Sequence, residues 1–366
     1  MSSGTIDLLQ LAGSAAAMGA AHGAARTAGI RQYAADRMSL VCGGTWSGGE
    51  ISRERVLELA ESMIPAHEAY SADLTAEMEA MAGEAGISVA EAIVVGGFTD
   101  FVDTVRGVIG EAPYEDNCTA VIVPADAAED RQAMLGQTWD MHDTATRHVV
   151  MLDISAERGP RSLVFSTEGC LGQIGMNEAG IAVGINNLTA HAGTIGVTWP
   201  FVVREVLKQT TIDAAVKCVA SAKLAGAHNY LIVDASGRGA NIEAMPQALE
   251  VTEVNGASFV HTNHALAEAA REHEAWRPSA LMESSRARLI RGRELVADAL
   301  QSPQTLMELT RDPDAICQVA HEPFHIESCG AAVMRPATGE LWAVWGRPDR
   351  NEYERFVLAG SSVLRD

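Results

Sequence analysis

The chain has 366 residues, of which 47% are apolar and 20% are charged. This composition favours one large folded domain, or two ordinary ones, over a disordered chain. A formal charge of −21 and the lack of any basic run exclude the basic surface that nucleic-acid binding requires. The sequence contains no apolar stretch of about eighteen residues, so we expect no membrane-spanning helix and no membrane partner.

The start of the chain and its cysteines indicate a cytoplasmic protein with reduced thiols. Residues 8–21 are apolar in places, but Asp7 precedes them and no basic residue opens the run, so we expect no signal peptide. No CxxC pair or dense spacing suggests a disulfide scaffold. The six cysteines are Cys42, Cys118, Cys170, Cys218, Cys317 and Cys329.

Up to about residue 110 the sequence predicts helices. Residues 53–66 and 71–85 carry apolar residues at helical spacing, and each stretch has acidic residues near its start, as helix N-termini prefer. Residues 110–117 are acidic and contain Pro113. They predict an exposed connection to the second part of the chain.

After Pro113 the sequence changes to short β-runs separated by turns. The predicted strands are 118–124, 133–139, 148–154, 162–167, 181–186, 230–233, 331–335 and 341–345. Helices are predicted at 199–222 and 283–299. Short turns between consecutive strands favour antiparallel pairing with helices on the sheet faces, which is an α+β domain.

Cys118 opens the first of these β-runs, and its position allows two interpretations. A small apolar residue at a strand end is common for an unreactive, buried cysteine. A thiol at the mouth of a sheet, directly after an exposed loop, can also be a nucleophile. Taken alone, the position favours the unreactive thiol.

Three polar clusters at the ends of β-runs favour the nucleophile. Residues 136–139 lead into Asp140, residues 181–185 lead into Asn186 and Asn187, and residues 258–260 lead into His261-Thr262-Asn263-His264. A Gly-bounded turn, 175–180, precedes the second of these runs. Loops at strand ends place functional groups on a rigid scaffold.

In this order, Cys-Thr, Gln-x-Trp-Asp, Gly-x-Asn-Glu-x-Gly and Thr-Asn-His, the motifs resemble the acyl-coenzyme A:6-aminopenicillanic acid acyltransferase family. This family of isopenicillin N acyltransferase and its bacterial relatives lies within the N-terminal-nucleophile hydrolases. Residues 18–23 and 77–86 upstream, and 285–288 and 346–348 downstream, also fit, so the resemblance covers most of the chain. Each motif is weak alone, but their order is fairly specific.

The resemblance implies a four-layer αββα sandwich preceded by a helical segment. It also implies that the chain cuts itself between Asn117 and Cys118. Residues 1–117 and 118–366 would then be two fragments that stay together as one compact unit, with a homo-oligomer as a further possibility. The new α-amine would act as base for the adjacent thiol, because the two groups titrate near pH 8 and 8.5. Neither a cofactor nor a metal is then required.

The resemblance also assigns roles to residues. Cys118 would be the nucleophile, Asp140 would orient its amine or thiol, and Asn263 would donate its side-chain amide to the oxyanion. Asn187 is the second candidate for an oxyanion or substrate contact. Further pocket candidates are Trp139, His142 and Trp199. The family's late-chain substrate arginine corresponds to either Arg288 or Arg335.

One residue departs from the family pattern, and two histidines allow a different interpretation of the site. Asn117 stands where the family often has Gly, although Asn is among the residues that best tolerate a strained backbone. Its own amide could also attack its carbonyl and cut the same bond by a second route. His261 and His264 could share a metal ion, but no third ligand lies nearby, so we expect no metal site.

The predicted function is acyl transfer from a small-molecule N-acyl amide through a thioester at Cys118. Hydrolysis of a linear amide, an amidase reaction, is favoured. An acyl-CoA-dependent N-acyltransferase, using an amine acceptor, would share the same intermediate. A bile-salt or N-acylethanolamine hydrolase is a related alternative, although the latter typically has Arg where this chain has Gln137. A binding protein that has kept the fold without catalysis is the alternative from another class.

Overall fold

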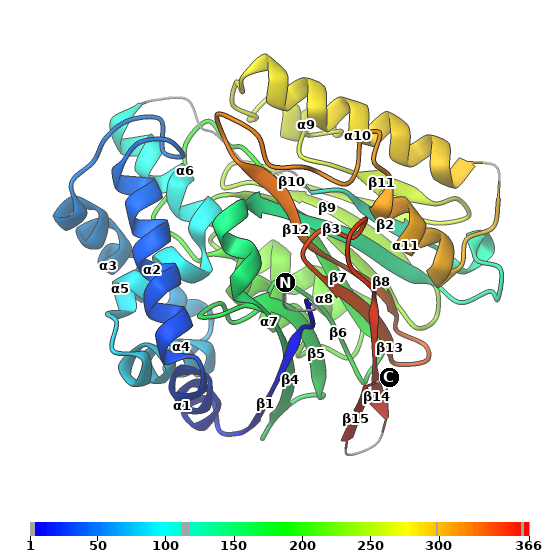
Figure 1. The fold of residues 1–366 in the computed structure, drawn as a ribbon, viewed down its shortest axis with the longest axis horizontal. Helices are drawn as coiled ribbons and strands as arrows, with labels where there is room; N and C mark the ends of the chain where they lie inside the picture. Colours follow the sequence, from blue (N-terminus) through cyan, green and yellow to red (C-terminus); the bar gives the residue numbers. More distant parts are fainter. Residues whose placement is uncertain (1–3, 111–117, 298, 360–361, 366) are drawn as a thin grey trace.

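Two β-sheets packed face to face form the centre of the protein (Figure 1). The computed structural model describes residues 4–110, 118–297, 299–359 and 362–365, with residue 359 and residues 362–365 described by their backbone only. The first sheet contains, in spatial order, β1 (Asp7–Gly13), β4 (Val149–Ala156), β5 (Ser162–Thr167), β6 (Ile174–Asn177), β7 (Ile181–Leu188), β8 (Ala227–Asp234), β9 (Gly239–Ala244) and β10 (Leu249–Val254). The second sheet contains β11 (Phe259–His261), β2 (Ala120–Val123), β3 (Met134–His142), β12 (Ile326–Arg335), β13 (Glu340–Trp345), β14 (Glu354–Ala359) and β15 (Ser362–Arg365).

Helices cover the outer face of each sheet, which gives the expected four layers. The helices α7 (Trp199–Val206) and α8 (Ile212–Ser221) pack on the first sheet. On the second sheet lie α10 (Ser279–Ala297) and α11 (Pro303–Arg311), whereas the short α9 (Glu268–Arg271) packs beside β10 of the first sheet. Figure 1 shows α10 lying lengthwise along this outer layer. The predicted αββα sandwich is therefore confirmed.

A group of helices from the first part of the chain packs beside the sandwich, at the left of Figure 1. Its members are α1 (Ala15–Ala25), α2 (Thr27–Cys42), α3 (Arg53–Tyr70), α4 (Ala72–Ala85), α5 (Val89–Gly96) and α6 (Phe98–Ile109). Side chains cap several of these helices. For example, Ser71 accepts a hydrogen bond from the N–H of Leu74 at the start of α4. The helices predicted at 53–66 and 71–85 are α3 and α4.

The first part of the chain is not purely helical, because residues Asp7–Gly13 form β1. This strand lies parallel to β4 at the edge of the first sheet, with Leu11 paired with Ile154. Gly13, at φ +104, then turns the chain into α1, whose N-cap is Ser14. The apolar residues in this stretch therefore lie in an edge strand of the first sheet, and the prediction of helix is wrong for residues 7–13.

The predicted strands of the second part are present, and among the described strands all pairs except β1–β4 are antiparallel. The helix predicted at 199–222 is two helices, because Thr211 caps a new start by accepting from the N–H of Ala214. No helix in the described part of the chain has the length and hydropathy needed to cross a membrane.

Candidate active site

Cys118 lies two residues before the start of β2, and side chains from three other elements form hydrogen bonds with its backbone. Its N–H donates a hydrogen bond to Asn263 Oδ1 at 2.6 Å. Its carbonyl oxygen accepts from Arg288 Nη1 at 2.6 Å and from Asn186 Nδ2 at 3.3 Å. The side chain is fully buried within the core cluster that contains Trp139. Cys118 is therefore held in place by polar groups from β7, α10 and the segment after β11.

The position of Asn263 follows from the pairing of β11 with β2. The two strands are antiparallel, with His261 opposite Ala120, so the residues after β11 lie beside those before β2. Asn263 Oδ1 also accepts from Arg288 Nη2 at 2.9 Å, and Asn263 Nδ2 donates to the carbonyl oxygen of Asn187 at 3.0 Å. The structure thus brings together the predicted residues Cys118 and Asn263.

Arg288 comes from α10, and its guanidinium is buried at the centre of the cluster. Besides its bonds to Cys118 and Asn263, Nη1 donates to Thr119 Oγ1 at 3.1 Å. Burial lowers the pKa of Arg288 to about 10, and the neighbouring Asp140 and Cys118 act in the opposite direction. Of the two candidate late-chain arginines, Arg288 is the one that lies in this cluster.

Asp140 lies on β3 with its carboxylate buried. Its Oδ1 accepts from Ser328 Oγ at 2.6 Å, and its Oδ2 accepts from Thr138 Oγ1 at 3.3 Å. Thr138 Oγ1 in turn accepts from the N–H of Thr119 at 3.1 Å. This chain of hydrogen bonds connects Asp140 to the residue that follows Cys118.

Asn187 presents a buried amide nitrogen at the end of β7. The residue is 2% exposed, and among the described residues its Nδ2 has no hydrogen-bond partner. An unused buried donor costs roughly 1–3 kcal/mol. The Asn187 carbonyl oxygen is bonded to Asn263, which contacts Cys118, so the backbone of Asn187 adjoins the cluster while its side-chain amide has no acceptor among the described residues.

Gln137 and Trp139, on the other face of β3, point toward the first sheet. Gln137 Oε1 accepts from the N–H of Ile185 at 2.8 Å, and Gln137 Nε2 donates to the Ile185 carbonyl. Gly184 allows this approach, because a Cβ there would lie 2.5 Å from Gln137 Oε1. The Trp139 ring packs edge-on against Phe165, with 6.3 Å between centroids. Gln137 therefore bonds the two sheets together, and Trp139 packs between them.

The described contacts of His142 lie away from this cluster. Its Nδ1 is 2.7 Å from Thr144 Oγ1, and its ring packs against Tyr33, Trp46 and Phe98 of the helical segment and the loop after α2. Burial lowers the pKa of His142 well below its usual value. The imidazole of His142 is therefore neutral and packed at the junction between β3 and the helical segment.

Trp199 and Arg335 also have contacts outside the cluster. Trp199 begins α7 and stacks obliquely on His228, with 5.4 Å between ring centroids. Arg335 ends β12, where its side chain pairs with Asp130 and Glu340. Trp199 is therefore a packing residue, and Arg335 belongs to a group of paired charges at the end of β12.

The two histidines of the Thr-Asn-His segment have separate partners. His261 Nε2 is 2.8 Å from Glu243 Oε1, and His264 Nδ1 is 2.8 Å from Ser285 Oγ. Burial lowers the pKa of His264 to about 4. Within the described residues, no group of three or more His, Cys, Asp or Glu side chains is arranged to hold a metal ion.

Two residues that support Asn263 were not predicted from the sequence. Arg277 Nη2 donates to the Asn263 carbonyl oxygen, and Ser285 Oγ accepts from the Asn263 N–H at 3.0 Å. Arg277 lies just before α10 and Ser285 lies within it; no role was predicted for either, although Ser285 belongs to the stretch 285–288 that fits the family. The predicted cleavage-site residue Asn117 lies outside the described residues.

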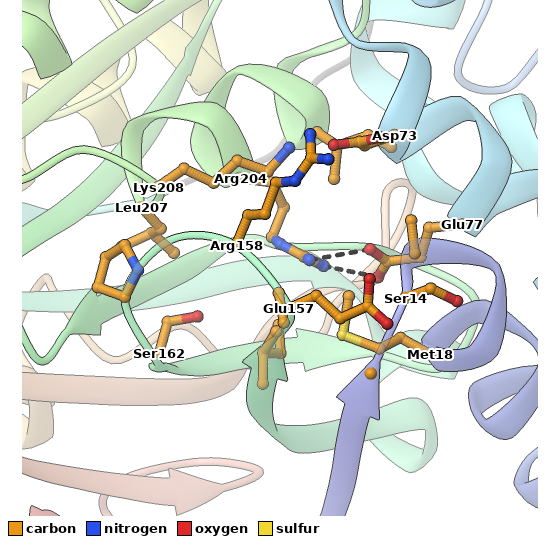
Figure 2. A pocket seen from close by; sticks show the side chains of 16 residues that line it. Ser14, Met18, Asp73, Glu77, Glu157, Arg158, Ser162, Arg204, Leu207 and Lys208 are labelled. Carbon is orange, nitrogen blue, oxygen red and sulfur yellow. Dashed lines mark hydrogen bonds and ion pairs between the residues drawn. The ribbon is translucent and has the colours of Figure 1, made fainter.

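A separate cavity of about 170 Å³ lies between the helical segment and the first sheet (Figure 2). At its floor, Arg204 forms a bidentate ion pair with Glu77, at 2.8 and 3.0 Å. Arg158 and Lys208 bring positive charge to its walls, and Asp73 and Glu157 bring negative charge. Since its lining excludes Cys118 and its contacts, this cavity is distinct from the candidate active site.

Comparison with known proteins identifies one family. The family model described as acyl-coenzyme A:6-aminopenicillanic acid acyl-transferase matches residues 127–350, more than half of the chain. A curated relative, the acyl-coenzyme A:6-aminopenicillanic-acid-acyltransferase 40 kDa form of Emericella nidulans, is 28% identical over 160 residues. That match spans 43% of this chain and 43% of the relative. It therefore covers less than half the length of the relative.

Two of the solved structures that match show a slight likeness. A mutant conjugated bile acid hydrolase from Clostridium perfringens has a TM-score of 0.46 and 11% identity, over 68% of this chain and 96% of that one. A penicillin V acylase from Agrobacterium tumefaciens has a TM-score of 0.36 and 13% identity, over 66% and 92%. Scores this low assign nothing to this chain.

Proposed function

Because the chain belongs to the acyl-coenzyme A:6-aminopenicillanic acid acyl-transferase family, we propose that it is an enzyme that takes an acyl group from a linear amide through a thioester at Cys118. The observation that carries the proposal is the convergence of Asn263, Arg288 and Asn186 on the backbone of Cys118. An inert strand-end thiol requires only apolar packing. Buried polar groups from three distant elements are costly to assemble, so their convergence favours a reactive residue.

In the proposed mechanism the bond between Asn117 and Cys118 is cut first, which converts the Cys118 N–H into an α-amine. Asn263 Oδ1 lies 2.6 Å from this nitrogen and accepts a hydrogen bond from it. This bond orients the amine. An α-amine titrates near pH 8, so it can take the proton of the adjacent thiol at little cost. Asp140 assists by its negative charge, through Thr138 and Thr119.

The thiolate then attacks the amide carbonyl carbon, and the carbonyl oxygen becomes an oxyanion. Asn187 Nδ2 can donate to this oxygen without losing another bond to the described residues. One N–H of Asn263 Nδ2 is bonded to the carbonyl oxygen of Asn187. The second N–H of the same nitrogen is the other donor to the oxyanion. As the tetrahedral species collapses, the C–N bond breaks and the α-ammonium gives its proton to the leaving amine. Water attacks the thioester and regenerates the thiol.

Hydrolysis is the favoured outcome, and transfer to an amine, with acyl-CoA as donor, is the alternative that uses the same thioester. Gln137 is neutral, and both of its amide atoms bond the backbone of Ile185, so it offers a substrate neither a charge nor a hydrogen bond. This arrangement differs from the arginine expected at that position in N-acylethanolamine hydrolases. Linear N-acyl amides are therefore the substrate class we propose.

Intact mass measurement of the expressed chain tests the proposal. We expect fragments of 117 and 249 residues from the 366-residue chain (366 − 117 = 249). The Cys118→Ala variant should stay uncut and inactive. Cys42→Ala removes a partly exposed thiol elsewhere and should still be processed. A panel of N-acyl amides, with and without acyl-CoA and amine acceptors, then separates hydrolysis from transfer.

Two outcomes would contradict the proposal. Processing of Cys118→Ala at the same bond would mean that the thiol does not initiate cleavage, and would favour attack by the Asn117 amide. If the wild-type chain stays uncut and its Cys118 does not react with iodoacetamide, the result would favour a binding protein that has kept the fold without catalysis.

A further inference from the structure

Residues 273–277 form a strip that lies against the chain just beyond β7. The N–H of His191 donates to the His273 carbonyl at 3.0 Å, and the N–H of Ala275 donates to the Thr189 carbonyl at 2.8 Å. Asn187 lies two residues before Thr189 on this same stretch. The strip is thus fixed by backbone bonds to the strand end that carries the unpartnered amide.

The same strip is also fixed to the strand end that carries Asn263. Glu274 Oε1 accepts from the N–H of Ala265 at 3.0 Å. Arg277 Nη2 donates to the Asn263 carbonyl oxygen and is 3.2 Å from Glu274 Oε1. Residues 273–277 therefore bridge the two asparagines that we propose for the oxyanion.

Trp276 is the exposed member of this strip. Its neighbours Ala275 and Arg277 are buried, at 8% and 3% exposure, whereas Trp276 is 66% exposed. The other tryptophans of the chain are buried or half-buried. Tryptophan carries a large apolar surface together with a polar N–H, and such side chains are enriched where proteins contact ligands and partners.

We propose that Trp276, next to the two residues that bond Thr189 and Asn263, binds the apolar group of the amide substrate, and so selects aromatic or aliphatic amides over polar ones. This inference rests on the proposed function. The strip holds the backbone of Trp276 in place, so the ring can be covered without reordering the chain. Each methylene that the ring covers strengthens binding by at most about fourfold.

Alkylation of Cys118 tests this without requiring turnover. The probes are N-methyl, N-butyl and N-octyl iodoacetamide, and peptide mass spectrometry measures the rate at Cys118 relative to Cys42. We expect the ratio to rise at least tenfold from the methyl to the octyl probe in the wild type and in Trp276→Phe. In Trp276→Ala the ratio should stay flat. Ile290→Ala, which removes another exposed apolar side chain (59% exposed) from α10, should behave as the wild type.

The outcomes separate the two proposals. If Trp276→Ala is cut into its two fragments but keeps the full dependence on tail length, Trp276 does not bind the tail and this inference is overturned. If the wild type reacts at Cys118 equally fast with all three probes, the inference also fails while the proposed nucleophile stands. If no probe modifies Cys118 in the wild type, the proposed function and this inference fail together.

Discussion

At the residue scale, Asn187 and Asn263 differ in what their side-chain amides already bond. Asn263 uses its oxygen on Cys118 and Arg288, and one N–H on the Asn187 carbonyl. Among the described residues, the amide nitrogen of Asn187 is buried and unused. Asn263 therefore holds Cys118 and keeps one N–H for a further acceptor, whereas both N–H groups of the Asn187 amide are unused by the described residues.

We therefore expect Asn187→Ala to lower kcat by about 10²–10³-fold with little change in KM, which is the usual cost of removing one oxyanion donor. The substitution keeps the backbone carbonyl that accepts from Asn263, so the rest of the cluster stays in place. Steady-state kinetics on the best amide substrate measures the effect.

Asn241→Ala is the matched control for that variant. Asn241 is a buried asparagine of β9 in the same sheet, and within the described part its Oδ1 also has no partner. Its loss should leave kcat within a factor of two. If Asn187→Ala keeps the wild-type kcat, the oxyanion is bound elsewhere, and Asn263 becomes the principal donor.

The sequence predicts the candidate site residues better than the residues that hold them. Cys118, Asn187 and Asn263 lie at or next to strand ends, and Asp140 lies two residues before the end of β3. Such positions are recognisable from a β-run bordered by polar residues. Support for Asn263 comes from Ser285, 22 residues further along the chain. No local pattern encodes such a contact, because it exists only once α10 packs on the second sheet.

At the element scale, the closest helix pair is α1 with α4, and two glycines of α1 make the approach possible. A Cβ on Gly19 would lie 2.0 Å from the Glu77 carbonyl oxygen, and one on Gly23 would lie 2.4 Å from that of Met81. Residues four apart share one helix face. The small residues of 18–23 therefore allow two backbones to touch.

We expect Gly19→Ala to lower the free energy of unfolding by about 3 kcal/mol, the upper part of the range for overpacking, because the obstructing atom is backbone and cannot rotate away. Gly83→Ala on α4 is the control. A Cβ there would have no heavy atom within 4 Å, so helix propensity should raise stability by about 0.5–1 kcal/mol.

Urea denaturation of both variants measures these changes through the midpoint at constant m-value. Both proteins should be compared on the uncut Cys118→Ala background, so that unfolding stays unimolecular. Equal midpoints for Gly19→Ala and Gly83→Ala would mean that α1 and α4 can separate without cost, and that their contact does not stabilise the fold.

The strands that the sequence did not predict include the fully buried β6 and β9 as well as the largely exposed β10. In β10 (Leu249–Val254) only Val254 is fully buried, so the strand has no alternation of apolar and polar residues to detect. The strand β5 is buried along its whole length, and the prediction 162–167 matches its bounds. Burial creates the hydrophobic pattern, so exposed edge strands are hard to recognise in a sequence.

At the scale of the whole molecule, the sequence indicated layers and antiparallel pairing but not the order of strands. In the second sheet β3 lies between β2 and β12, so Asp140 meets Ser328 across 188 residues of chain. Local patterns do not specify partners at such separations. The ordered motifs that resemble a known family supplied what the local patterns could not.

The helical segment is joined to the sandwich by buried contacts, which supports the expectation that the fragments stay associated after cleavage. His67 of α3 is one such contact. Its Nδ1 donates to the Met63 carbonyl at 2.9 Å, and its Nε2 accepts from the N–H of Thr198, the N-cap of α7, at 3.1 Å. The imidazole is therefore held neutral, and burial lowers its pKa to about 4.

This pKa predicts a dependence of stability on pH. An unfolded histidine binds a proton near pH 6.5, whereas His67 in the folded protein binds one only near pH 4. Between these values the unfolded state holds more protons, so the stabilisation is complete above pH 6.5 and is lost as the pH falls toward 4. Each pH unit in this window costs about 1.4 kcal/mol.

We therefore expect the free energy of unfolding of the uncut Cys118→Ala chain to fall by about 2 kcal/mol more, from pH 7.5 to pH 5.0, than that of the same chain carrying His67→Gln. Glutamine can accept from Thr198 but does not titrate, so the difference between the two chains isolates His67 from the other groups that titrate in this range. Urea midpoints at the two pH values provide the measurement. Parallel losses in both chains would mean that His67 becomes protonated without leaving its place, and that the junction between the helices and the sandwich tolerates the charge.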